Sequence, residues 1–388
     1  MLYGAATALC LAVSAIQAAP IEYRVSFDGT LDNREYGVKP VYRLADETFF
    51  FARGIAEAGV AVDGENRIGA GLMPTVWFGA PDTARLPVNA LLYFRHESRR
   101  TRFRFGAFPR RAEAIGAPKD VVPTAATGAF PQAGALGLPA ESQNQTAPPR
   151  VGALESLPAW FFGDESAYRR PYVHGAAVDV GGFRGLSAGA WVDWTGLRDT
   201  SVNEAFLFGY GLAYAHGAFF ARHDFMMYHL ALPFNPVPGA SVKDNGGASA
   251  EIGAAWGKIC GYIDTVAASA GVIASLDRDR ADMEWRTPAG GFVSGFAGRG
   301  MIALRGFYYA GQAQRMAWGE SLYNCSGVEL FGRWDVIIRF FNKNRGTGGA
   351  FGVTNLSAEL ISSFYLIGEK FGSSQHFVLH ADYGTYPK

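Results

Sequence analysis

The sequence predicts an all-β protein, an antiparallel up-and-down β-barrel of about sixteen strands. Short segments in which polar and apolar side chains alternate follow one another along almost the whole chain, and a period of two is that of a strand. The connections between these segments alternate between tight turns and longer loops. Glycine (49 residues) and aromatic residues (14%) are abundant, whereas charged residues make up 18%, and this mix suits twisted strands and tight turns better than helices.

The clearest alternation lies in residues 88–110, VNALLYFRHESRRTRFRFGAFPR. Two strands joined by a polar turn at residues 98–99 share one polar face: Tyr93, Arg95, Glu97, Arg100, Arg102 and Arg104. The opposite face is apolar and partly aromatic. A soluble sheet packs such a face on a core, whereas a membrane barrel turns it toward lipid and lets the arginines line water.

The N-terminal segment is an apolar run without charge that ends in small residues. It predicts a secretory signal peptide at residues 1–19 and leaves residues 20–388 as a single domain. No later stretch approaches the ~18 consecutive apolar residues that a spanning helix needs. If the protein lies in a membrane, it must therefore be a closed barrel, because no other strand structure satisfies every backbone group in lipid.

The expected strands follow in order from the signal to the C-terminus, with fourteen or eighteen also within range. They are residues 21–31, 48–62, 68–79, the two arms of the hairpin, 171–180, 186–195, 206–215, 219–232, 248–256, 262–275, 292–297, 301–310, 327–341, 356–367 and 376–383. The turns after the even-numbered strands up to the twelfth are tight, and those after the odd-numbered strands up to the thirteenth are mostly longer. Outer-membrane barrels alternate in this way, whereas a Greek-key sandwich has no reason to.

Charged side chains gather on the face that encloses water in a barrel, since arginine on the lipid face costs roughly 2–4 kcal/mol at the midplane. The expected lining residues are Arg53, Glu57, Arg95, Glu97, Arg100, Arg102, Arg104, Glu329, Arg333, Asp335 and Arg339. Two interpretations stay open. The arginines form a cationic wall that attracts anionic solutes, or the interior is packed with salt bridges, for which the candidate partners are Glu57, Glu97, Asp193, Glu251 and Glu329.

A long segment at residues 111–170 interrupts the strands. It is rich in Ala, Pro and Gly and has no periodicity, and loops of this length are either functional or disordered. Trp160, Arg169 and Arg170 near its end are expected to reach the lumen and form a constriction. A mobile external insertion is the alternative for residues 118–149.

These features resemble Gram-negative outer-membrane β-barrel proteins of the porin type. The phrases LDNREYG, FRFGAFPR, DWTG and KDNGGA are similar to barrel proteins of Bacteroidota, a family without a characterised activity. The resemblance implies an outer-membrane location, reached through the signal peptide. It also implies that the third external loop, residues 111–170, folds into the barrel and narrows a pore.

The function classes narrow accordingly. The chain carries 35 basic and 35 acidic residues, and zero net charge argues against a nucleic-acid binder. No nucleophile elbow, metal spacing or nucleotide fingerprint is present, so we expect no enzyme, catalytic residue, metal or cofactor. The expected function is passive diffusion of small hydrophilic, preferably anionic, solutes through the outer membrane. The alternatives are a plugged, non-conducting barrel acting as a surface receptor or as a subunit of an envelope complex, and a secreted glycan-binding β-sandwich. The expected partners are outer-membrane lipid and small hydrophilic solutes, together with further copies of the chain or an envelope protein.

Overall fold

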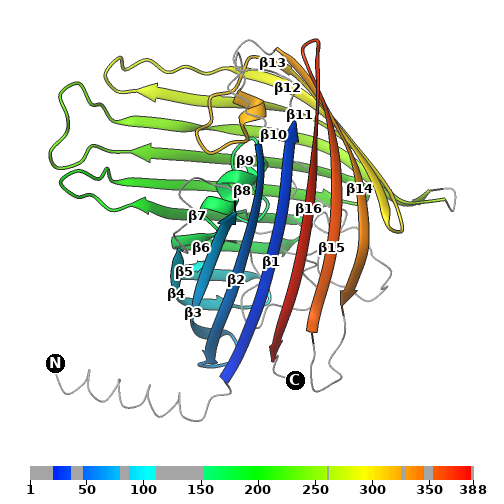
Figure 1. Cartoon of the computed structure of the whole chain (residues 1–388), viewed down its shortest axis with the longest axis horizontal. Coiled ribbons are helices and arrows are strands. Elements are labelled where there is room, and N and C mark those ends of the chain that lie inside the picture. The colour runs from blue at the N-terminus through cyan, green and yellow to red at the C-terminus, as the bar shows by residue number, and fades with distance from the viewer. Residues whose placement is uncertain are drawn as a thin grey trace.

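The computed structural model describes residues 21–35, 47–78, 87–110, 153–259, 262–324, 329–344 and 353–385. Over these ranges, sixteen strands form one closed antiparallel barrel in which each strand pairs with its neighbours in sequence and the first pairs with the last (Figure 1). The predicted fold class is confirmed. The alternative of a secreted β-sandwich is wrong, because the sheet closes on itself instead of splitting into two layers.

The bounds of the elements are as follows. The strands are β1 (Ile21–Glu35), β2 (Glu47–Ala61), β3 (Asn66–Phe78), β4 (Val88–Glu97), β5 (Thr101–Pro109), β6 (Tyr172–Phe183), β7 (Leu186–Gly196), β8 (Ala205–His216), β9 (Phe219–Leu230), β10 (Lys243–Ile259), β11 (Ile263–Asp279), β12 (Ala289–Arg299), β13 (Ile302–Gly311), β14 (Leu330–Asn344), β15 (Val353–Ile367) and β16 (Lys370–Thr385). The short helix α2 (Asp164–Arg169) and the 3₁₀ turn η2 (Ser321–Asn324) lie in two of the connections.

Closure is made by β1 and β16, which pair from Tyr23 with Thr385 to Glu35 with Ser373. Since the two strands are antiparallel, the beginning of β1 and the end of β16 lie at the same end of the barrel (Figure 1). The tight turns after β2, β4, β6, β8 and β12 are at this end, and the longer connections are mostly at the other. One connection at the long-loop end departs from the rule, because only residues 368–369 join β15 to β16.

Alternation of burial confirms the predicted faces. On β1, Glu22, Arg24 and Ser26 are buried, whereas Ile21 and Val25 are 71% and 50% exposed. Large apolar side chains stay exposed on the outer face of strands around the barrel: Phe27, Leu72, Leu92, Phe105, Ile252, Val272, Val293, Leu304 and Trp334. Apolar side chains outside and ionic ones inside are the opposite of a soluble protein and the pattern of a barrel surrounded by lipid.

Several strand ends differ from the sequence prediction. The turn expected between residues 180 and 186 lies at Arg184 and Gly185, both with positive φ, because β6 and β7 continue to pair through a register shift between Val180 and Phe183. The strands β10 and β11 have 17 residues each, so the loop expected between residues 275 and 292 shortens to residues 280–288. The last strand begins at Lys370 instead of residue 376. The polar residues before residue 376 belong to the sheet, and Ser374 among them is buried and faces inward.

Candidate functional site

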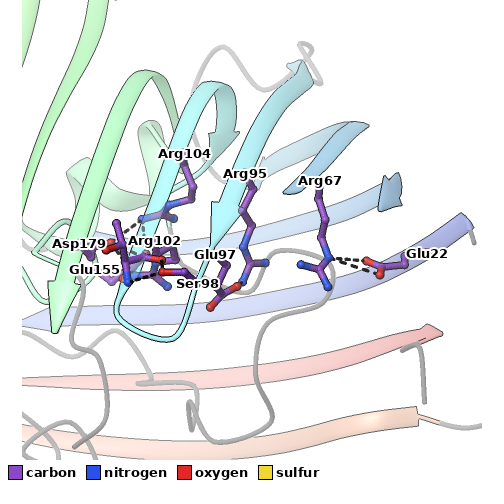
Figure 2. A network of polar contacts seen from close by, with 10 residues as sticks. Glu22, Arg67, Arg95, Glu97, Ser98, Arg102, Arg104, Glu155 and Asp179 are labelled. Atoms are coloured by element: carbon purple, nitrogen blue, oxygen red, sulfur yellow. Dashed lines mark hydrogen bonds and ion pairs between the residues drawn. The ribbon is translucent and has the colours of Figure 1, made fainter. Parts of the chain in front are cut away.

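The interior of the barrel holds most of the charged side chains on which the sequence prediction rested. On the wall formed by β1 to β5, these side chains are paired with opposite charges. The pairs are Arg24 with Glu57, Arg53 with Asp28, Arg67 with Glu22 and Arg95 with Glu97. Figure 2 shows Arg67, Arg95, Arg102 and Arg104 side by side along neighbouring strands. A buried charge requires a partner because leaving it unpaired is costly.

A four-residue ionic cluster lies at one end of this network (Figure 2). Arg102 contacts Glu155 at 2.5 Å and Asp179 at 2.9 Å. Arg104 contacts the other oxygen of Glu155 at 2.6 Å and lies 3.8 Å from Asp179. Burial alone would raise the pKa of Glu155, but the two guanidinium groups outweigh it and hold that pKa below its usual value. Glu155 is therefore an anion clamped between two arginines of β5.

Glu155 belongs to residues 153–163, which we call the inward segment. The wall makes room for the beginning of this segment with glycines. A Cβ on Gly189 of β7 would lie 2.8 Å from the Cβ of Ala153, and one on Gly211 of β8 would lie 3.1 Å from it. The N–H of Ala153 donates to Asp179 at 3.0 Å. Both glycines face the lumen, so the segment runs against the inner wall.

The inward segment then reaches the opposite wall. Trp160 is 1% exposed and packs on Phe292 of β12 and Phe307 of β13, with ring centroids 5.1 and 6.0 Å apart. The strand β13 lies eight places from β5 in the sixteen-strand order. The segment therefore spans the interior from Arg102 and Arg104 on one side to these aromatic rings on the other.

A second connection, residues 312–324, also folds inward and meets the first. Gly163 donates its N–H to Trp318 at 2.8 Å, and Glu320 donates to Ala159 at 2.9 Å. Phe162 stacks on Trp318 with rings 5.7 Å apart and nearly parallel. The sequence reasoning treated these residues as an ordinary loop. One feature of the sequence could have indicated this inward folding: the connection contains several large apolar side chains, Met316, Trp318, Leu322 and Tyr323.

The predicted constriction residues divide into two kinds. Trp160 lies inside, as described, and Arg170 joins Arg110 on one buried carboxylate, that of Asp193, at 2.7 and 2.5 Å respectively. Arg169 is exposed at the end of α2. Residues 153–163 of this connection therefore lie inside the barrel, whereas residues 118–149, for which the alternative of an external insertion was given, lie outside the described part of the chain.

The predicted ladder on β14 faces inward. The carboxylate of Asp335 accepts hydrogen bonds from Arg305 at 2.5 Å and from Arg333 at 2.8 Å. Arg339 forms an ion pair with Glu359 at 3.1 Å. Glu329, expected on the same face, is exposed one residue before β14.

Arg100 also lies away from the inner wall. It is exposed in the turn before β5, 4.6 Å from the centre of the Phe183 ring. The alternation of residues 100–104 had suggested that all three arginines lie on the strand, but β5 begins only at Thr101.

The structure contains features of both interpretations of the arginines, the interior packed with salt bridges and the cationic wall. Glu57, Glu97 and Asp193 are ion-pair partners, as the packed-interior interpretation expected. Around Asp193, arginines outnumber carboxylates in direct contact, because Arg110 and Arg170 share that one side chain. Among the described residues, no group of three or more His, Cys, Asp or Glu side chains could hold a metal ion. His380 contacts Asp28 at 2.6 Å.

Comparison with known proteins shows a likeness of fold. No family model and no curated protein matches the chain. Among solved structures, it is similar to the outer membrane protein OpdK from Pseudomonas aeruginosa, at 9% identity over 94% of this chain and 99% of that one, with a TM-score of 0.47. It is also similar to a loop-deletion mutant of OmpT, an outer membrane protein of Vibrio cholerae, at 8% identity over 94% of this chain and 100% of that one, with a TM-score of 0.49. A triple mutant of a Rhodopseudomonas blastica porin is similar at 11% identity over 94% of this chain and 100% of that one, with a TM-score of 0.45.

Proposed function

We propose that the protein is a porin-type pore in the outer membrane of a Gram-negative bacterium, through which small hydrophilic solutes diffuse passively. The observation that carries the proposal is the closed sixteen-strand barrel with an apolar outer face and an ionic inner face. Barrels of sixteen to eighteen strands are wide enough to enclose an aqueous channel. Export through residues 1–19 and an origin in Bacteroidota belong to the same proposal, which assigns no catalytic residue and no cofactor.

The inward segment supplies the constriction in this proposal. It crosses the lumen between β5 and β13, so the open cross-section is divided and narrowed where the arginines lie. Selectivity follows from charge at that level. Most arginines are neutralised by a carboxylate, so the preference for anions rests on places where arginines outnumber carboxylates, as Arg110 and Arg170 do around Asp193. In a low-dielectric pore, even one excess charge attracts counter-ions.

A second candidate is a plugged, non-conducting barrel that serves as a surface receptor or as a subunit of an envelope complex. The observation that favours it is the burial of the inner wall. Arg95 is 1% exposed and Asp193 is fully buried, and an aromatic cluster joins the inward segment to the opposite wall. Side chains in a wide water-filled lumen would be more accessible.

Conductance separates the two candidates. The full chain, purified in detergent and reconstituted into a planar lipid bilayer, should give stepwise, ohmic current with a modest preference for anions in a salt gradient. Absence of current at every voltage, with circular dichroism showing an intact β-barrel, would reject the pore and support the plugged barrel. Recovery of the protein in the outer-membrane fraction tests the location separately.

A further inference from the structure

A cluster of charged side chains lies on the outer face of the barrel, at the long-loop end of β9, β10 and β11. Asp244 of β10 pairs in register with His229 of β9 and with Arg278 of β11. The next residue along β10, Asn245, faces the interior, because its side chain accepts the N–H of Ala317 in the inward-folded connection at 2.7 Å. Since successive side chains of a strand face opposite sides, Asp244 and the residues in register with it point outward.

Three basic side chains contact the single carboxylate of Asp244. Arg278 donates to it from Nε and Nη2 at 3.1 and 2.5 Å, and Arg280 from the same two atoms at 2.9 and 3.1 Å. The Nδ1 atom of His229 lies 2.7 Å from its Oδ1. Asp244 is 5% exposed, whereas the side chain of Arg280 is 42% exposed. One buried negative charge thus orients two guanidinium groups, and the cluster carries an excess of at least one positive charge.

The acidic side chains of the adjoining loop have basic partners of their own. Asp279 lies 3.9 Å from Lys243, and Asp282 lies 3.2 Å from Arg286. These carboxylates are therefore matched by other cations, and the positive excess stays with the two arginines around Asp244.

The depth of the cluster follows from the length of β10. Trp256, near the other end of the strand, is 44% exposed on the same outer face. At about 3.3 Å per residue and a strand tilt of roughly 40°, Asp244 lies ~30 Å from it along the barrel axis. Exposed apolar side chains, among them Ile252 and Val272, occupy the outer face between these levels. Because the apolar band of such barrels is about 25 Å tall, the cluster lies among the lipid headgroups, on the side of the long external loops.

Aromatic rings adjoin the cluster at this level. The guanidinium of Arg278 lies 4.3 Å from the centre of the Trp285 ring, and Trp285 is 45% exposed. On the other side, the Phe206 ring lies 5.0 Å from that of His229, and the Trp194 ring follows at 6.4 Å from Phe206. Tryptophan and other aromatic side chains gather where a membrane protein meets the headgroups, which agrees with the depth worked out from β10.

We propose that Arg278, Arg280 and His229, oriented by Asp244, form a binding site for the phosphate group of a phosphorylated lipid of the outer leaflet, with Trp285 beside the headgroup. Arginine binds phosphate through pairs of N–H donors, and the contacts with Asp244 leave Nη1 of each guanidinium for a second acceptor. At headgroup depth that acceptor is a lipid phosphate. The site rests on the outer-membrane location proposed above and not on conduction.

The test uses the full-length protein in a non-ionic detergent and three probes: lipid A with its phosphates, the same lipid with the phosphates removed, and inorganic phosphate. Thermal unfolding is followed by tryptophan fluorescence. We expect lipid A to raise the melting temperature of the wild type by roughly 2–4 °C and the other two probes to leave it unchanged. An equal rise with the dephosphorylated lipid would overturn the phosphate site, and an equal rise with inorganic phosphate would overturn the lipid as its ligand.

Two variants locate the binding. The rise should disappear in the double variant Arg278→Gln, Arg280→Gln and persist in Arg299→Gln. Arg299 is the matched control, because it also lies on an aromatic ring, 5.6 Å from the centre of Tyr262, but at the opposite end of the barrel. Equal responses of the two variants to lipid A would contradict the assignment to β11.

A measurement on the wild-type chain decides the matter if the double variant does not fold. Phenylglyoxal modifies accessible arginines, and mass spectrometry of the peptides gives the rate at each one. Lipid A should slow the modification of Arg280 several-fold relative to the dephosphorylated lipid and leave the rate at Arg299 unchanged. Equal rates at Arg280 with the two lipids would overturn the proposal. A barrel that binds lipid A without conducting would retain this site and lose the pore, and one that conducts without binding would lose only the site.

Discussion

Replacement of Trp160 by alanine tests whether the inward segment is the constriction. Trp160 is 1% exposed and contacts the rings of Phe292, Phe307 and Tyr323. Truncating a buried tryptophan to alanine costs about 3–5 kcal/mol. If that cost falls on docking of the segment, the ratio of docked to released segment drops by roughly 10²- to 4 × 10³-fold, at tenfold per 1.4 kcal/mol.

The assay is single-channel conductance in a planar bilayer, with Trp194→Ala as the matched control. Trp194 lies on β7 and its side chain is 42% exposed on the outer face, so its removal leaves the lumen unchanged. We expect Trp160→Ala to conduct several-fold more than the wild type and Trp194→Ala to equal it. If Trp160→Ala equals both while folding normally, the segment does not limit the passage and the reasoning fails.

Three further predictions use the same contacts. Gly189→Val should expel the inward segment, because the added side chain occupies the place of its backbone, and should speed tryptic cleavage at residue 169, whereas Gly306→Ala, with ordinary room around its Cβ, should not. Since the pKa of Glu155 is depressed in the folded state, its docking is fully present above the ordinary glutamate pKa of ~4.3 and is lost as pH falls through the lower folded value, which acrylamide quenching of tryptophan fluorescence should detect as greater accessibility only in acid. Asp335→Asn should lower stability by about 3–5 kcal/mol, since the buried Arg305 and the half-buried Arg333 lose their shared carboxylate, while Glu329→Gln at an exposed position should stay within about 0.5 kcal/mol in denaturant unfolding.

The fold was predictable because the alternation of polar and apolar residues in each strand shows which side chains face the interior and which face outward. On β4 and β5, polar and apolar side chains alternate so regularly that both faces could be assigned, and the structure confirms them from Tyr93 to Glu97 and from Thr101 to Phe105. The strands β10 and β11 were drawn too short, since Gly246 and Gly247 lie within a strand where the sequence suggests a loop. Glycine and alanine are neither clearly polar nor clearly apolar, so the alternation cannot be recognised there although the strand continues.

The site was predictable in kind but not in its pairing. Alternation places Arg102 and Arg104 toward the lumen, but it cannot say which carboxylates meet them. Asp179 arrives through the register of β5 with β6, and Glu155 through a segment without periodicity. The docking of residues 312–324 against the inward segment likewise depends on shape, for which a single sequence has no repeating signal.

Fluorescence quenching by brominated lipids tests the central claim most directly, namely that the apolar face contacts hydrocarbon and the ionic face encloses the interior. Two variants are needed, each retaining one tryptophan in the reconstituted barrel: Trp334, which is 46% exposed on the outer face of β14, or Trp160, which is 1% exposed within the barrel. The structure predicts strong quenching of Trp334 and almost none of Trp160. Equal quenching of the two, or protection of Trp334, would contradict it.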